Sequence, residues 1–224
     1  WLTTLLPLYV QILKELAEEG VQWVQIDEPI LVTKLSDADI ARLKTVYGTF
    51  AEAVPGLNIV LQTYFEAVDR YADIISLPVK SIGLDFVHGL QGNLASLQTV
   101  GFPADKVLGA GVIDGRGIWK ASLREKLGLL EEITALVPAD QLIVQSSSSL
   151  LHVPVSTERE TKLEPVLKAA LAYADEKLAE LVLLTKAVSA GSAEIAEELA
   201  ACDRALQDLQ ESEARNRNDI EQKV

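Results

Sequence analysis

The stretch Val21-Gln-Trp-Val-Gln-Ile-Asp-Glu-Pro-Ile-Leu31 joins a short apolar run to two adjacent carboxylates and a proline. The apolar run is typical of a strand that is buried on both faces, as in a parallel sheet. Asp27 and Glu28 interrupt this run. Because burying an unpaired charge is costly, we expect both carboxylates to lie where the strand leaves the core. Pro29 cannot donate a hydrogen bond to a neighbouring strand, which supports the end of pairing at this point.

Asp27 and Glu28 are the first candidates for binding or chemistry. In a parallel α/β barrel the carboxyl ends of the strands form the face that carries the active site. The structural alternative is that the two carboxylates cap the strand and the next helix, or pair with a neighbouring Lys or Arg. The stretch alone leaves both readings open.

Helical and strand patterns alternate along the rest of the chain. Four more apolar runs predict strands over residues 57–65, 79–87, 106–114 and 141–146. The helical patterns cover residues 4–19, 36–53, 67–76, 93–100, 122–137 and 162–186, and a last one runs from Gly191 to about residue 215. Ser36 is the expected N-cap of the second helix, with Asp39 at the position of a capping box.

Strict alternation predicts parallel strands with right-handed crossovers, and therefore an α/β fold. Five βα units fill part of a (β/α)8 TIM barrel, which needs about 250 residues. A flavodoxin-like open sheet fits the strand count better, but no Gly-rich phosphate-binding motif follows any strand. We expect residues 1–190 to form a partial barrel and residues 191–224 a helical extension or linker.

Polar side chains follow the expected strands and would gather on one face. Together they suggest a pocket for a polar or cationic group, in which Arg116 could pair with Asp114 or Asp85. The candidate rim residues are Asp27, Glu28, Asp85, Asp114, Arg116, Ser148 and His152.

The histidines, serines and single cysteine give weaker signals. His152 could carry a proton, but its apolar neighbours favour a structural role, and His88 is interpreted in the same way. No Gly-x-Ser-x-Gly motif surrounds the Ser146–Ser149 run, which argues against a serine nucleophile. Cys202 has no disulfide partner, and its spacing from the histidines fits no zinc motif, so we expect no metal site in this chain.

Composition excludes several classes of protein. The net charge of −13 argues against nucleic-acid binding, which depends on Lys and Arg. No apolar run is long enough to cross a bilayer and no secretory signal is visible, so we expect a cytoplasmic protein. The chain begins with Trp1 and contains no Met, and we interpret it as a piece of a longer protein.

Several stretches together resemble the cobalamin-independent methionine synthase family. They keep their order over residues 1 to about 190, and they are Trp23-Val-Gln-Ile-Asp-Glu-Pro29, Gly111-Val-Ile-Asp-Gly-Arg-Gly-Ile-Trp119, Ser147-Ser-Ser-Leu-Leu-His-Val-Pro154, Glu160-Thr-Lys-Leu163 and Ala174-Asp-Glu-Lys-Leu-Ala-Glu-Leu181. The resemblance implies two face-to-face barrels, with this chain as the later part of the N-terminal one. It also implies a methyl transfer from 5-methyltetrahydrofolate polyglutamate to homocysteine, without cobalamin. A zinc ion in the C-terminal barrel would hold the homocysteine sulfur as a thiolate.

Carried over residue by residue, the resemblance places none of the zinc ligands here. The family's His-x-Cys pair is absent from this sequence. Asp27 is the counterpart of the aspartate that binds the homocysteine amino group in the catalytic barrel. Ser148 stands where many N-terminal barrels of the family have Cys, and a serine cannot supply a thiolate. We therefore expect no catalytic or metal-binding residue in this chain, and a scaffold that supports the folate groove and the C-terminal catalytic barrel.

Two alternatives remain open from the sequence. One is a self-sufficient barrel methyltransferase or decarboxylase that uses Asp27, Glu28 and His152 directly. The other is a stand-alone scaffold or interaction domain, whose open strand edges would favour self-association.

Overall fold

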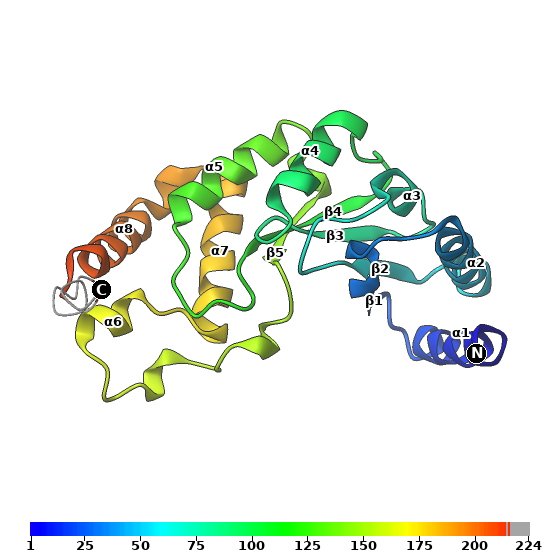
Figure 1. The fold of residues 1–224 in the computed structure, drawn as a ribbon, viewed down its shortest axis with the longest axis horizontal. Coiled ribbons are helices and arrows are strands. Elements are labelled where there is room, and N and C mark those ends of the chain that lie inside the picture. Colours follow the sequence, from blue (N-terminus) through cyan, green and yellow to red (C-terminus); the bar gives the residue numbers. More distant parts are fainter. Residues whose placement is uncertain (214, 216–224) are drawn as a thin grey trace, which may run out of the picture. The chain divides into compact units, whose positions relative to one another are not determined.

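The computed structural model describes residues 1–213 and 215, and Figure 1 shows the order of its helices and strands. The α-helices are α1 (Leu2–Glu18), α2 (Asp37–Ala53), α3 (Tyr71–Ile75), α4 (Leu90–Val100), α5 (Leu123–Thr134), α6 (Pro165–Ala170), α7 (Ala174–Ala190) and α8 (Ala196–Glu211). The strands are β1 (Trp23–Asp27), β2 (Asn58–Gln62), β3 (Ser81–Asp85), β4 (Val107–Ile113) and β5 (Leu142–Ser146). Short 3-10 helices include η1 (Pro29–Val32), η3 (Leu150–His152) and η5 (Ser192–Ile195). None of the helices in this part of the chain is long and apolar enough to span a bilayer.

The strands form one sheet with the order β1-β2-β3-β4-β5. The pairs from β1 to β4 are parallel, and the register places Asp27 opposite Gln62 and Asp85 opposite Gly111. Each of the five predicted strands contains one observed strand. The predicted α/β class is therefore confirmed, with strands that follow the sheet in chain order.

One prediction about the opening stretch is wrong, because the first strand is not buried on both faces. β1 covers only Trp23–Asp27, its residues alternate between exposed and half-buried, and the Trp23 side chain is 46% exposed. The reason is its position, since β1 is the first strand in the sheet order and pairs with β2. After Asp27 the chain turns into η1, with Pro29 in its first turn, as expected for a residue that cannot continue a ladder.

The chain divides into two compact units, and the first contains residues 1–111 and 136–143. Its core consists of apolar side chains of β2, β3 and β4 and of the helices beside them, including Tyr47, Ile59, Leu61, Ile74, Ile82, Leu84, Phe86, Leu97 and Leu108. α2 begins at the predicted capping box. Ser36 Oγ accepts a hydrogen bond from Asp39 N, and the Asp39 carboxylate accepts one from Ser36 N, so this prediction is confirmed.

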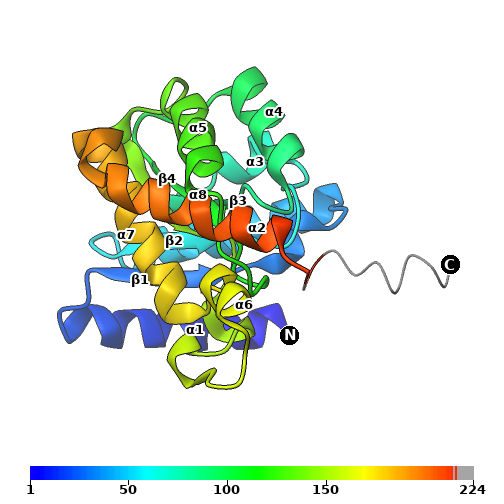
Figure 2. The same cartoon turned by 90° about the vertical axis from the view of Figure 1, so that its left-hand side faces the viewer.

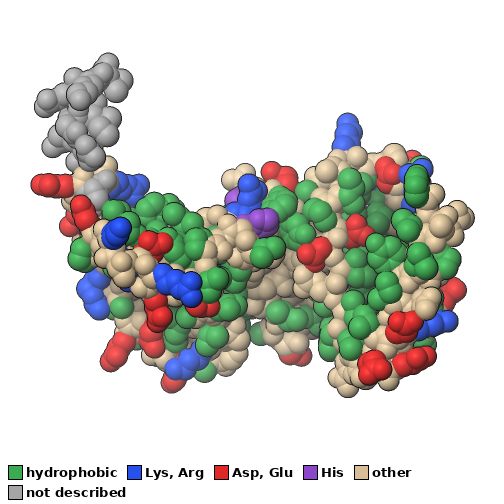
Figure 3. Space-filling view, turned by 90° about the horizontal axis from the view of Figure 1, so that it is seen from below, with side chains coloured by type: hydrophobic (Ala, Val, Ile, Leu, Met, Phe, Trp, Pro, Cys, Tyr) green, Lys and Arg blue, Asp and Glu red, His purple; other side chains and the backbone are tan. Residues whose placement is uncertain are grey.

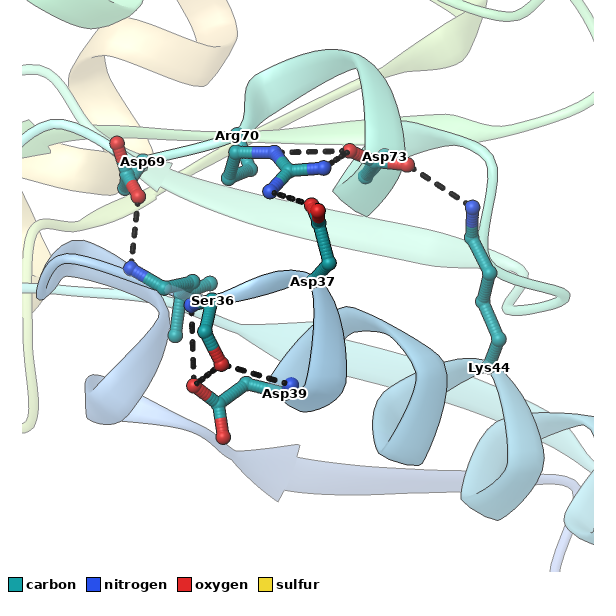
Figure 4. A network of polar contacts seen from close by, with 8 residues as sticks. Ser36, Asp37, Asp39, Lys44, Asp69, Arg70 and Asp73 are labelled. Carbon is teal, nitrogen blue, oxygen red and sulfur yellow. Dashed lines mark hydrogen bonds and ion pairs between the residues drawn. The ribbon is translucent and has the colours of Figure 1, made fainter.

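A polar network in the first unit joins α2 to α3 (Figure 4). The Arg70 guanidinium donates to Asp37 and Asp73, and Lys44 donates to the other oxygen of Asp73. Leu35 N donates to the Asp69 carboxylate at 2.8 Å, which fixes the approach to α2. The ion pairs lie at the surface, so they contribute more to the geometry of this loop than to stability.

α1 lies beside β1 (Figures 1 and 2) but buries only Leu13. Leu8, Tyr9 and Ile12 are each more than half exposed. Figure 3 looks from below, onto the side where α1 lies in Figure 1, and shows hydrophobic side chains at the surface there. This apolar surface adjoins the edge of the sheet that β1 forms.

The second unit contains residues 112–135 and 144–224. In it α5 packs on α7, and α8 packs on α5 and α6 (Figure 2). The predicted single helix over residues 162–186 is wrong, because α6 ends at Ala170 and α7 begins at Ala174. Leu171 forms an isolated β-bridge with Trp119, and Ala172 N donates to Ile118 O, so these non-local bonds replace helical ones.

The buried face of α7 also differs from the sequence-based prediction. The apolar spacing over residues 162–186 places Leu167, Leu171, Leu178 and Leu181 on one face of the predicted helix, yet Leu178 is 52% exposed. The buried residues are instead Lys177, Glu180, Leu184 and Ala187, which repeat at helical spacing. α7 ends before Gly191, which has a left-handed φ of 98°. The domain boundary at residue 190 stays a prediction, and residues 214 and 216–224 of the proposed extension lie outside the described part of the chain.

Candidate functional site

Asp27 ends β1 and keeps both carboxylate oxygens near the surface of the first unit. Gln25 Nε2 donates to Oδ1 at 2.7 Å, and the Tyr64 hydroxyl donates to Oδ2 at 3.1 Å. Desolvation raises the pKa of Tyr64, and the charge of the nearby Asp27 carboxylate raises it further. The Tyr64 hydroxyl therefore stays protonated and orients Asp27 as a donor. An exposed, oriented carboxylate at a strand end can accept a cationic or hydrogen-bonding group from a ligand.

Glu28 lines a mainly apolar cavity of about 660 Å³ between α1, β1 and α2. Its Oε1 accepts a hydrogen bond from the Tyr47 hydroxyl at 3.2 Å, and Tyr47 itself is fully buried. Burial raises the pKa of Glu28, and the bond from Tyr47 offsets part of that rise. Asp27 lines the same cavity. Asp27 and Glu28 thus line one cavity.

Removing the Glu28 charge is expected to change how stability depends on pH. The folded-state pKa is raised above 4.5, so the folded chain holds this proton more tightly than the unfolded chain does. The resulting stabilisation is present below the ordinary pKa and is lost as pH rises through the raised value. We expect the free energy of unfolding of the native chain, minus that of Glu28→Gln, to fall as pH rises from the ordinary glutamate pKa of 4.5 through the raised value.

Urea unfolding at a series of pH values measures this difference. Glu52→Gln, which removes a carboxylate from the exposed surface of α2, is the matched control for loss of one negative charge. A difference between the native chain and Glu28→Gln that grows as pH rises would contradict the burial of Glu28.

Asp85 is completely buried at the end of β3. Its Oδ2 accepts a hydrogen bond from Phe65 N at 3.0 Å, and its Oδ1 accepts from Val87 N and His88 N at 2.8 Å each. Phe65 has a φ of 87°, which is rare for a residue with a side chain. The carboxylate therefore holds two loops of the first unit, including the strained turn after β2.

Asn93 completes this arrangement and was not singled out from the sequence. It is fully buried; its Nδ2 donates to Asp85 O at 2.9 Å, and its Oδ1 accepts from Val68 N at 3.0 Å. An asparagine near the start of a predicted helix is a normal capping residue, so its position gave no signal of a contact with the β3 end.

In the second unit, Asp114 and Arg116 lie on the tight loop after β4. Asp114 Oδ1 accepts a hydrogen bond from Arg116 N at 2.8 Å, and Gly115 N donates to Ser147 Oγ at 3.2 Å. Arg116 is exposed, whereas Gly115 is buried. The loop thus presents a guanidinium group, which can bind a carboxylate through paired hydrogen bonds.

Ser148 and His152 follow β5 in the same unit. The Ser148 side chain is 3% exposed, and its Oγ has no hydrogen-bond partner among the described residues. Its carbonyl oxygen accepts from Ser146 Oγ at 2.8 Å. His152 is the last residue of η3 and is exposed. Ser148 therefore packs under the β4 loop, and His152 lies on the surface.

The described residues do not fit a zinc site. Across residues 1–213 and 215, no group of three or more His, Cys, Asp or Glu side chains is placed to hold a metal ion. Cys202, the one cysteine, is 4% exposed and donates from Sγ to Ala121 O at 3.1 Å. Burial raises the pKa of its thiol, which disfavours the thiolate that zinc requires.

A family model described as the N-terminal domain of the cobalamin-independent synthase matches residues 1–138. The chain belongs to the cobalamin-independent methionine synthase family. Two curated relatives of the family, both named 5-methyltetrahydropteroyltriglutamate–homocysteine methyltransferase, are close in sequence. The one from Listeria welshimeri is 49% identical over 96% of this chain, and the one from Bacillus subtilis is 51% identical over 92%.

The chain spans only 28% and 27% of the lengths of these two relatives of the synthase family. Among solved structures, a B12-independent methionine synthase from Shewanella, in complex with selenomethionine, is similar. The match covers 86% of this chain and 55% of the Shewanella chain. The sequence identity of that match is 20% and the TM-score is 0.46.

Proposed function

We propose that this chain is part of the N-terminal barrel of an enzyme that transfers a methyl group from 5-methyltetrahydropteroyltriglutamate to homocysteine in the cytoplasm. The observation that carries the proposal is the match of residues 1–138 to the N-terminal domain model. Relatives that are 49% and 51% identical to this chain are named for this activity. In this proposal the chain is a scaffold, and the chemistry occurs in a C-terminal barrel elsewhere in the whole protein.

The strand order supports an incomplete (β/α)8 barrel rather than a flavodoxin-like sheet. A flavodoxin-like sheet has the order 2-1-3-4-5. Its second strand is added on one side of the first, and the later strands are added on the other side. The order here is consecutive from β1 to β5, as it is around a barrel. Further strands would then adjoin β1 and β5, which are the ends of this order.

The contacts of the rim carboxylates support a scaffold role. Asp85 uses both oxygens to bind backbone amides, and Asp114 binds the amide of Arg116. Neither arrangement resembles a general acid or base that faces a substrate. Asp27 and Glu28 in the first unit, and Arg116 and His152 in the second, remain separate candidates for contacts with a substrate, and we propose that they serve binding rather than methyl transfer.

Zinc in the whole enzyme would be held by ligands outside this chain and would keep the homocysteine sulfur nucleophilic. We therefore expect isothermal titration of this chain with zinc and homocysteine to show no stoichiometric binding of either. Cys202→Ser and His152→Ala are the matched controls, because each removes a candidate zinc donor, and neither is expected to change the heats.

Tight binding of one zinc ion per chain, abolished by Cys202→Ser, would overturn the scaffold proposal. Methyl transfer by the chain alone would also overturn it and would favour a self-sufficient enzyme that uses Asp27, Glu28 and His152. Transfer by the whole protein, assayed with the triglutamate substrate, is the result expected if the proposal is right.

A further inference from the structure

Two charged side chains lie on the buried face of α7. Lys177 is completely buried and Glu180 is 5% exposed. Desolvation of ionised groups is costly, and apolar residues of similar size often stabilise such positions equally well. Stability alone therefore does not account for a lysine and a glutamate here, and their partners indicate what they do.

Both side chains bind the backbone of one segment, residues 119–121, which follows the β4 loop. Lys177 Nζ donates to Trp119 O at 3.2 Å, and Glu180 Oε1 accepts from Ala121 N at 3.0 Å. Ala121 O accepts a further bond from Cys202 Sγ of α8. The segment is thus held by two helices of the second unit.

The other end of the loop is also fixed. Gly115 N is bound by Ser147, and Arg116 N is bound by the Asp114 carboxylate. Arg116 thus belongs to the first anchored end, precedes the second at residues 119–121, and is exposed. The direction of its guanidinium group therefore depends on bonds at both ends of the loop, including those made by α7.

The electrostatics of the second unit agree with this arrangement. Burial lowers the pKa of Lys177, and the nearby Glu180 and Asp114 carboxylates offset part of that change. Burial raises the pKa of Glu180, and its bond from Ala121 N and the charge of Lys177 oppose the rise. Glu180 Oε2 has no hydrogen-bond partner among the described residues, so this buried carboxylate is not fully compensated.

We propose that Lys177 and Glu180 are positioning residues that hold the loop of residues 114–121, so that Arg116 can bind a carboxylate of the substrate. The inference rests on the proposed function. Two substrates of that reaction carry carboxylates, the triglutamate folate and homocysteine. The guanidinium group suits either because it binds a carboxylate through two parallel hydrogen bonds.

The test uses the whole enzyme with Lys177→Met and Glu180→Gln, each compared with Lys186→Met. Lys186 is an exposed lysine on the same helix, bonded to Glu194, and is the matched control. Hydrogen exchange of the amides of residues 115–121 is expected to accelerate about tenfold in the two buried variants. Lys177→Met removes the donor to Trp119 O, and Glu180→Gln replaces the charged acceptor of Ala121 N with a weaker neutral one. The control is expected to leave this exchange unchanged.

Kinetics distinguish positioning from a purely structural role. We expect Lys177→Met to raise the KM of one carboxylate substrate about tenfold while kcat stays within a factor of about two. A rise confined to the triglutamate substrate identifies its tail as the ligand, and a rise confined to homocysteine identifies the amino acid. Arg116→Met is expected to give the same rise, and the double variant no more than Arg116→Met alone.

Unchanged exchange in both buried variants, or additive effects of Lys177→Met and Arg116→Met on KM, would overturn the inference. If Lys177→Met does not fold, Glu180→Gln decides, because glutamine keeps the size of the side chain and an acceptor for Ala121 N. A native whole protein that transfers no methyl group refutes the proposed function instead, and the exchange experiment still decides whether α7 holds the loop.

Discussion

Replacing Asp85 with alanine is expected to lower the free energy of unfolding by about 3–5 kcal/mol, the cost of removing one partner from a buried charged network. The carboxylate accepts hydrogen bonds from Phe65 N, Val87 N and His88 N. Asp85 has no exposed surface, so water cannot easily replace these acceptors. Its loss also removes the bond that holds Phe65 at a φ of 87°.

Urea unfolding of the chain at neutral pH measures the effect. Asp27→Ala is the matched control, because Asp27 also ends a strand but is exposed and binds only side chains. That control is expected to cost no more than about 1 kcal/mol. Asp85→Asn should fall between the two, because the amide keeps one acceptor oxygen and turns an amino group towards backbone donors. Equal losses for Asp85→Ala and Asp27→Ala would refute the structural role of Asp85.

The strands could be predicted from the sequence because their signals are local. Val21–Leu31 and the four later apolar runs each end in polar or turn residues, and the structure confirms a strand in each. The capping box of Ser36 and Asp39 is equally local and is confirmed. The exposure of β1 could not be predicted in this way, because it depends on which strands pair with it.

The break in the predicted helix over residues 162–186 has a non-local cause. Leu171 and Ala172 bond to Trp119 and Ile118, about fifty residues earlier in the chain. Helical periodicity carries no information about such a partner. The buried face of α7 differs from the leucine face of the sequence pattern because two of its buried residues are charged. Lys177 and Glu180 share helical spacing with Leu184 and Ala187, and that spacing was the available signal.

The positions of the candidate site residues could be predicted from the sequence, but the groups that they bind could not. The sequence indicated polar residues at strand ends, and the structure places Asp27, Asp85 and Ser148 at or just after the ends of β1, β3 and β5. Whether a carboxylate faces a ligand or binds its own loop depends on backbone amides that the sequence does not mark. Asp85 and Asp27 are the same residue type at equivalent strand positions, yet only Asp85 is enclosed by three amides. Any binding role of these rim residues stays a prediction.

Gly115→Ala is expected to lower the free energy of unfolding by about 2–3 kcal/mol, the cost of forcing an extra methyl group into a packed site. A Cβ atom at residue 115 would lie 2.5 Å from Ser148 O and 2.6 Å from Ser148 Oγ. Rotation can move the hydroxyl, but the carbonyl oxygen belongs to the backbone after β5. The β4 loop must therefore shift, which would also weaken the bond from Gly115 N to Ser147 Oγ.

Gly128→Ala is the matched control in the same unit. Gly128 lies inside α5 and has no atom within 4 Å of the position of a Cβ, so alanine there is expected to raise the free energy of unfolding by about 0.5–1 kcal/mol. Adding Ser148→Ala to Gly115→Ala removes the hydroxyl but not the carbonyl oxygen, and only part of the lost stability should return. Full recovery would show that the side chain alone limits the space. A stabilising effect of Gly115→Ala, like that of Gly128→Ala, would refute the close packing of this loop on Ser148.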